Sequence, residues 1–266
     1  MLIDTHCHLD AAEFDHDRDA VIADAHVQGV KIIVIPAVEQ SNFATVKQLA
    51  HRIEGGFYAL GIHPMYVHKA QDQDLDLLEQ EIARSMDDPR FVGVGEIGLD
   101  FFVTEIANGA YRERQEYFYS AQLSLAKQFN LPVILHVRKS QDTLLKYLRR
   151  FSLSGGIAHA FNGSFQQAKA FNDLGFALGM GGAMTYTRSL QIRRLAAELD
   201  LSHLVLETDA PDIPPAWLSE PNRRNTPGQI RRIAQVLADI RQESLEAISQ
   251  ATANNAKRVL PRMILS

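Results

Sequence analysis

The chain has 266 residues, of which 46% are hydrophobic and 22% charged, enough to build one large barrel domain or two small domains. Its net charge of −5 excludes a generally basic protein that grips duplex DNA by neutralising many phosphates. The sequence also holds no run of 18 apolar residues, which argues against a membrane-spanning helix.

The N-terminal region and the cysteine content indicate a cytoplasmic protein. The first predicted strand begins at about Leu2, which leaves no room for a signal peptide of roughly 15–30 residues. The single cysteine, Cys7, cannot form an intramolecular disulfide, and this fits a reducing compartment. We therefore expect a cytoplasmic location.

Short apolar segments that end in Gly, Pro or a polar residue predict eight strands, and their Val, Ile and Leu content is typical of a parallel sheet buried on both faces. In chain order they are residues 2–8, 31–38, 57–63, 91–99, 132–137, 156–161, 177–182 and 203–209. Amphipathic segments predict helices over residues 17–26, 42–52, 75–85, 110–129, 140–150, 164–174, 189–199 and 226–241, and an extra helix follows over residues 244–259.

This alternation predicts a (β/α)8 TIM barrel with an extra C-terminal helix, because eight units in 266 residues average about 33 residues each. No linker divides the chain, so we expect a single barrel domain over residues 1–266. The alternative is a doubly wound open sheet, which would need a glycine-rich phosphate loop after the first strand. The sequence has His6-Cys7-His8-Leu9-Asp10 at that position.

Metal-ligand side chains recur at the ends of the predicted strands. His6 and His8 share one face of the first strand, so both imidazoles can reach one cation, while Cys7 points toward the helices. Glu96 lies in an apolar, glycine-rich strand, where an uncompensated carboxylate would cost several kcal/mol. We interpret Glu96 as a bridge between two cations, with an Arg or Lys partner as the alternative.

The later strands add further candidates. His136 and His159 end the fifth and sixth strands, and each alone would be interpreted as a structural histidine. Glu207 and Asp209 share a face of the eighth strand, where two buried carboxylates repel each other without a cation. We predict Asp209 as a ligand or general base, and Glu207 as a partner that orients the ligands. His63 closes the third strand and is expected to contact substrate rather than metal.

Together these positions predict a site for two divalent cations. Nitrogen and oxygen ligands without thiolate suit Zn, Mg, Mn, Fe or Co. Basic clusters lie nearby, and we interpret most of their side chains as solvated helix faces. Arg138, Arg223 and Arg224 are candidates to hold one or two substrate phosphates. The clusters comprise Arg138, Lys139, Lys146, Arg149 and Arg150, then Arg223, Arg224, Arg231 and Arg232.

The motifs resemble the TatD family of metal-dependent hydrolases, within the amidohydrolase superfamily, over nearly the whole chain. They are residues 3–8 (IDTHCH), 61–64 (GIHP), 95–100 (GEIGLD), 132–136 (PVILH), 159–164 (HAFNGS) and 206–211 (LETDAP). Residues 166–168 and 220–223 resemble one bacterial branch of that family.

The resemblance implies a TIM barrel and a deoxyribonuclease that trims DNA 3′ ends. It implies as metal ligands His6, His8, Glu96, His136, His159 and Asp209. The sequence departs from many relatives in two places, both expected at the substrate entrance. It has Arg224-Asn225-Thr226-Pro227 instead of Arg-Asn-Glu-Pro, and Val137 where Ser is frequent.

The predicted reaction is hydrolysis by metal-activated water, with single-stranded DNA ends as the expected substrate. Asp209 would take the proton, and His159 or His63 would stabilise charge on the substrate oxygen. One alternative is a hydrolase of a small ester, amide or phosphoester, because the fold does not set the substrate. A second alternative is a non-catalytic metal-binding protein, although structural zinc sites often include thiolates. The sequence indicates no obligate protein partner.

Overall fold

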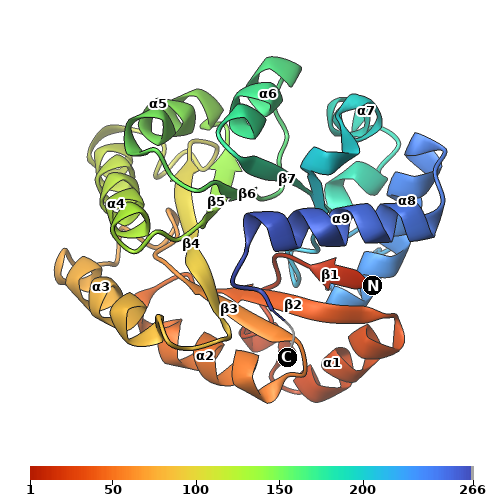
Figure 1. Ribbon diagram of the computed structural model, residues 1–266, viewed down its shortest axis with the longest axis horizontal. Coiled ribbons are helices and arrows are strands. Elements are labelled where there is room, and N and C mark those ends of the chain that lie inside the picture. The colour runs from red at the N-terminus through yellow and green to blue at the C-terminus, as the bar shows by residue number, and fades with distance from the viewer. Residues whose placement is uncertain (265–266) are drawn as a thin grey trace.

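The computed structural model describes residues 1–264, and these form parallel strands that alternate with helices around a barrel (Figure 1). The eight strands form one sheet in chain order, as the predicted (β/α)8 fold requires. They are β1 (Leu2–Asp4), β2 (Val30–Pro36), β3 (Gly56–Leu60), β4 (Phe91–Asp100), β5 (Val133–Arg138), β6 (Gly156–Ala158), β7 (Phe176–Met180) and β8 (Leu204–Leu206).

The helices α1 to α8 each follow the strand of the same number and surround the barrel (Figure 1). Their bounds lie within two residues of the predicted ones except at α8, where Pro227–Gln229 forms a separate 3-10 turn before the helix. They are α1 (Arg18–Val27), α2 (Phe43–Arg52), α3 (Gln73–Ser85), α4 (Gly109–Gln128), α5 (Gln141–Phe151), α6 (Phe165–Asp173), α7 (Leu190–Glu198) and α8 (Ile230–Arg241); α9 (Leu245–Val259) is the predicted extra helix.

Backbone hydrogen bonds bring the segments that follow β1 and β8 together. Thr5 N–H donates to Leu206 O at 3.1 Å, and Asp209 N–H donates to His6 O at 2.9 Å. His8 N–H donates to Ala210 O at 2.8 Å. These bonds connect the first and last parts of the sheet, so residues almost the whole chain apart meet at one point of the rim.

Six strands end two to four residues earlier than the sequence pattern predicts, namely β1, β2, β3, β6, β7 and β8. β1 stops at Asp4, β3 at Leu60, β6 at Ala158 and β8 at Leu206, so the candidate ligands that follow them lie in the segments beyond the strands. Ala160 and Asp209 have φ values of 44° and 58°. A left-handed residue does not continue a strand, and it redirects the side chains next to it.

The core has two apolar layers, one between the strands and the outer helices and one inside the barrel. Helix α9 supplies apolar side chains to the inner layer and crosses in front of the strands in Figure 1. Asn255 of α9 donates to Leu204 O, where β8 begins, and Arg262 donates to Phe91 O, where β4 begins. Helix α9 therefore covers the N-terminal ends of the strands and leaves the C-terminal ends free.

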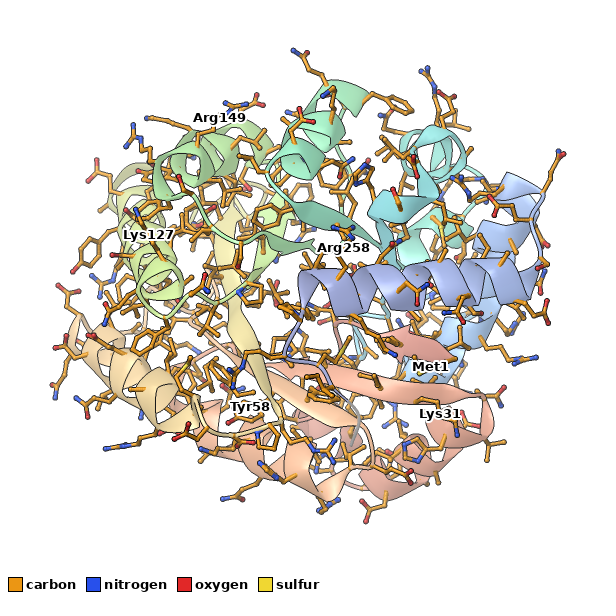
Figure 2. The ribbon with its side chains drawn as sticks, in the orientation of Figure 1. Met1, Lys31, Tyr58, Lys127, Arg149 and Arg258 are labelled. Atoms are coloured by element: carbon orange, nitrogen blue, oxygen red, sulfur yellow. The ribbon has the colours of Figure 1, made fainter. Side chains whose placement is uncertain are left out.

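Charged side chains cover the outside of this ring (Figure 2). Lys127 of α4, Arg149 of α5 and Arg258 of α9 are exposed. Lys146 and Arg150 of α5 are exposed as well, as expected for a solvated helix face. Within residues 1–264, every helix is too short or too polar to cross a bilayer.

The attachment of α9 gives a test of fold stability. Asn255 is buried and donates to Leu201 O at 2.7 Å and to Leu204 O at 2.8 Å. Because Asn255→Ala leaves both carbonyls without this donor, we expect the free energy of unfolding to fall by about 1–3 kcal/mol in urea denaturation. Asn254→Ala, at an exposed position on the same helix, should change it by less than about 0.5 kcal/mol. Equal effects of the two substitutions would contradict this account of α9.

Candidate metal centre

A pocket of about 980 Å³ opens at the C-terminal ends of the strands. It is lined by His8, His63, Glu96, His136, His159 and Asp209, and His6 is fully buried nearby. This is the end of a (β/α)8 barrel at which active sites are built. The sequence-predicted ligands therefore meet in one place, although they come from different strands.

One oxygen of Glu96 faces three imidazoles. Glu96 Oε1 lies 2.8 Å from His136 Nδ1, 3.0 Å from His159 Nε2 and 3.2 Å from His63 Nε2. The His63 and His136 rings also approach each other, with His63 Nε2 3.0 Å from His136 Nδ1. His63, which the sequence placed against substrate, thus lies among the candidate ligands.

The other oxygen of Glu96 faces the histidine pair that follows β1. Glu96 Oε2 lies 3.1 Å from His6 Nε2 and 3.3 Å from His8 Nε2, and these two nitrogens are 3.2 Å apart. Asp209 Oδ1 completes this side at 3.5 Å from both nitrogens. Cys7, between the two histidines, is fully buried and belongs to the apolar layer under the outer helices, as predicted.

Charges inside this cluster shift the pKa values of its members. Burial disfavours the charged form of Glu96, yet His63, His159 and His6 hold the pKa of this carboxyl well below its ordinary value. Burial raises the pKa of Asp209 to about 6. Burial, and then the neighbouring His159, lowers the pKa of His6 well below its ordinary value. The cluster therefore combines an ionised acid with at least one neutral imidazole.

The donor set fits divalent cations. Three groups of side chains each place one ligand atom per residue within 4.8 Å of the others. Several imidazole nitrogens face both carboxylate oxygens and each other, so more lone pairs than protons point inward. A cation between them would satisfy lone pairs that hydrogen bonds alone cannot. The groups are His6, His8 and Asp209; His6, Glu96 and His159; and His63, Glu96 and His136.

Comparison with known proteins identifies the family. A family model described as TatD related DNase matches residues 3–261. The chain is 42% identical over 255 residues to YjjV of Escherichia coli K12, named a metal-dependent hydrolase, covering 95% of both chains. The crystal structure of that YjjV matches with a TM-score of 0.91 and 41% identity, covering 98% of both chains.

The chain belongs to the TatD family. It is accordingly a metal-dependent hydrolase, and the likeness to YjjV agrees with the bacterial branch indicated by residues 166–168 and 220–223. A human protein named deoxyribonuclease TATDN3 is 31% identical over 269 residues, covering 98% of this chain and 95% of its own. The structure of a TatD family hydrolase from Entamoeba histolytica, at 20% identity and a TM-score of 0.83, shares the fold.

In this TatD protein, Glu207 lies behind His159 rather than in the pocket. Its Oε1 accepts the backbone N–H of Ala160 and lies 3.4 Å from His159 Nδ1. The carboxylate occupies space that a side chain at Gly179 would fill, because a Cβ there would come within 2.1 Å of Glu207 Oε2. This placement fits the predicted orienting role for Glu207, which stays a prediction.

Asp100 is a site residue that the sequence analysis missed. It is fully buried at the end of β4, and its Oδ2 lies 3.0 Å from His136 Nε2. Because a carboxylate can only accept, this contact holds a proton on His136 Nε2, and a cation beside Glu96 would then find the Nδ1 lone pair free to bind it. The sequence could have indicated Asp100 by its position, because it ends the same strand that carries Glu96.

Asp4 is a second buried acid that the sequence analysis did not single out. It accepts the Thr208 hydroxyl at 2.6 Å and the Thr208 N–H at 3.0 Å. Burial raises the pKa of Asp4 to about 8. Asp4 therefore connects β1 to the turn that carries Asp209, and it acts on the shape of the site rather than on the substrate.

The three predicted phosphate contacts have different positions. Arg138 is half-exposed and lines the pocket. Arg223 lies outside the pocket lining, and its Nη1 is 3.7 Å from Glu220 Oε1. Arg224 donates to Asp17 through Nη1 and Nη2, and its Nη1 also donates to Glu13 O. Of the three, only Arg138 lies beside the metal centre.

The two departures from the family pattern also differ in their distance from the pocket. Val137 lines the pocket, whereas Thr226 does not. Asn225, beside Thr226, is fully buried and donates to Thr208 O at 2.8 Å and to Asp212 O at 2.9 Å. The segment that contains Thr226 thus supports the turn after β8 from outside the pocket.

The contact between Asp100 and His136 yields a test. In Asp100→Asn, an amide N–H can face His136 Nε2 and move the imidazole proton to Nδ1, where it blocks ligation. We expect divalent metal affinity to fall about 10- to 100-fold in a chelator competition titration. Asp142→Asn, an exposed change on α5, should leave the affinity unchanged. Equal affinities for Asp100→Asn and the unsubstituted protein would remove Asp100 from this role.

Proposed function

We propose that this TatD protein is a deoxyribonuclease that hydrolyses phosphodiester bonds from the 3′ ends of single-stranded DNA. The observation that carries the proposal is the meeting of Glu96 with imidazoles from several strands, in a pocket whose rim holds Arg138. The family description and the name of human TATDN3 support DNA as the substrate. We propose that the protein acts in the cytoplasm.

The residues that would hold two divalent cations are those of the cluster. His6, His8 and Asp209 gather on the Glu96 Oε2 side, and His136 and His159 on the Oε1 side. Glu96 has an oxygen for each side, as a bridging ligand requires. His63 is a further candidate on the Oε1 side, or a substrate contact beside it.

Bound divalent cations supply Lewis acidity that activates water and polarises a phosphoryl oxygen. The protein supplies the remaining functions. Asp209 borders the pocket with 13% of its side chain exposed, so it can take a proton from the attacking water. His63, where it does not bind a cation, can donate toward the developing charge on the substrate oxygen. The ring nitrogens of His159, the other residue expected in this role, face Glu96 and Glu207. Arg138 can hold a phosphate at the rim.

The substrate class can be tested directly. The protein is treated with chelator, reloaded with Mg, Mn, Zn or Co, and assayed on single-stranded oligonucleotides carrying a 3′ label. A panel of small esters, phosphoesters and dipeptides is assayed in parallel. We expect metal-dependent release of the 3′ nucleotide. Turnover of a small ester or dipeptide without any nucleotide release would replace the DNA proposal with a small-molecule hydrolase.

The role of Asp209 is tested by Asp209→Asn, which keeps an oxygen for the metal but cannot take a proton. We expect kcat on the oligonucleotide to fall about 100- to 10,000-fold, because this is the usual contribution of a general base. Metal content, measured on the same sample, must stay unchanged for the comparison to hold. Asp173→Asn, an exposed change on α6, is the matched control. Full turnover with full metal content would exclude Asp209 as the proton acceptor.

A further inference from the structure

An exposed aromatic ring lies beside two cations on the rim of the pocket. Phe102 follows β4 and is 49% exposed. Arg138 Cζ lies 4.0 Å and Lys139 Nζ 4.8 Å from the centroid of its ring. All three residues line the same pocket as Glu96 and His136. An apolar ring left half-exposed at the rim of a pocket, between two cationic side chains, marks a surface that a ligand can cover.

This group is fixed relative to the metal centre through Asp100. The Asp100 Oδ1 atom accepts the N–H of Phe102 at 2.8 Å and that of Val103 at 3.0 Å. The other oxygen lies 3.9 Å from Arg138 Nη1 and 3.0 Å from His136 Nε2. The buried Asp100 carboxylate therefore fixes the positions of Phe102 and Arg138 relative to His136, a candidate metal ligand.

The opposite wall of the pocket carries negative charge. Asp10, Glu13 and Asp212 line it. Burial, together with these carboxylates and Glu39, raises the pKa of Tyr66, which lies among them. The nearby Arg224 is paired with Asp17 and cannot offset that charge for a ligand. A polyanion is repelled from this wall and directed toward the Phe102 side.

We propose that Phe102, Arg138 and Lys139 form a nucleotide clamp. Phe102 stacks on a nucleobase next to the scissile bond, and Arg138 and Lys139 hold the phosphates that flank that base. The clamp rests on the proposed nuclease function and specifies it. Because every base has a flat π face, such a clamp accepts any sequence but requires a base. An ester or dipeptide without a base would gain nothing from it.

The test removes either the base or the ring. Single-stranded oligonucleotides are made intact, or with one abasic tetrahydrofuran nucleotide at either position flanking the scissile bond. For the unsubstituted protein with metal, kcat/KM should fall roughly 5- to 150-fold when the stacked base is missing. Phe102→Ala should cause a similar fall on the intact strand and little further fall on the abasic one. Phe102→Trp, which keeps a stacking face, should restore the dependence on the base.

A matched control distinguishes the clamp from a general surface effect. Tyr111 of α4 is 50% exposed and lies outside the pocket lining, so Tyr111→Ala should behave as the unsubstituted protein does. Arg138→Ala should weaken binding of intact and abasic strands alike and reduce its salt dependence. If abasic strands react as well as intact ones, or if Phe102→Ala keeps the full preference for a base, the clamp is wrong.

Binding measured without turnover separates this proposal from the nuclease function. Fluorescence anisotropy of the same strands in chelator gives the affinities of the unsubstituted protein and of Phe102→Ala. Affinity that falls for the abasic strand only when Phe102 is present supports the clamp, even if the metal-loaded protein cleaves no DNA. That combination would overturn the nuclease proposal alone. Cleavage with binding that ignores the base would overturn the clamp alone.

Discussion

The buried carboxylate of Glu96 sets the conditions that the rest of the site must meet. It is 1% exposed, and it keeps its negative charge because imidazoles surround it on both oxygens. Two of these imidazoles have a buried acid behind them, Asp100 behind His136 and Glu207 behind His159. A charge in so apolar an interior is tolerable only within a complete cluster, which makes the members depend on one another.

Much of this arrangement could be predicted from the sequence, because a parallel barrel brings all strand ends to one rim. The apolar segments located the strands, and the last polar residue of several segments supplied the candidate ligands. The predicted ends of β1, β3, β6 and β8 were three or four residues too late. We extended the first and last predicted strands to the polar residues His8 and Asp209, whereas the backbone leaves the sheet after Asp4 and Leu206 to make the turns that aim His6 and Asp209.

Other features depend on contacts that sequence cannot display. Nothing in the strand pattern tells which nitrogen of His136 faces Asp100, although that choice determines the free lone pair. The pairing of Arg224 with Asp17 joins residues 207 positions apart, so a candidate phosphate contact is already occupied. Phe102 lies beyond the strand pattern, and the turn after β4 brings it to the pocket rim beside Arg138.

Helix α9 divides the barrel into an end that is closed and an end that is open. Its apolar face fills the space inside the N-terminal ends of the strands, and Met263, near the end of the described chain, belongs to that layer. Met1 precedes β1 at the same end. An affinity tag, a surface linker or a fused protein attached ahead of Met1 would therefore start from the closed base. Such an attachment would keep the substrate entrance clear for immobilised assays.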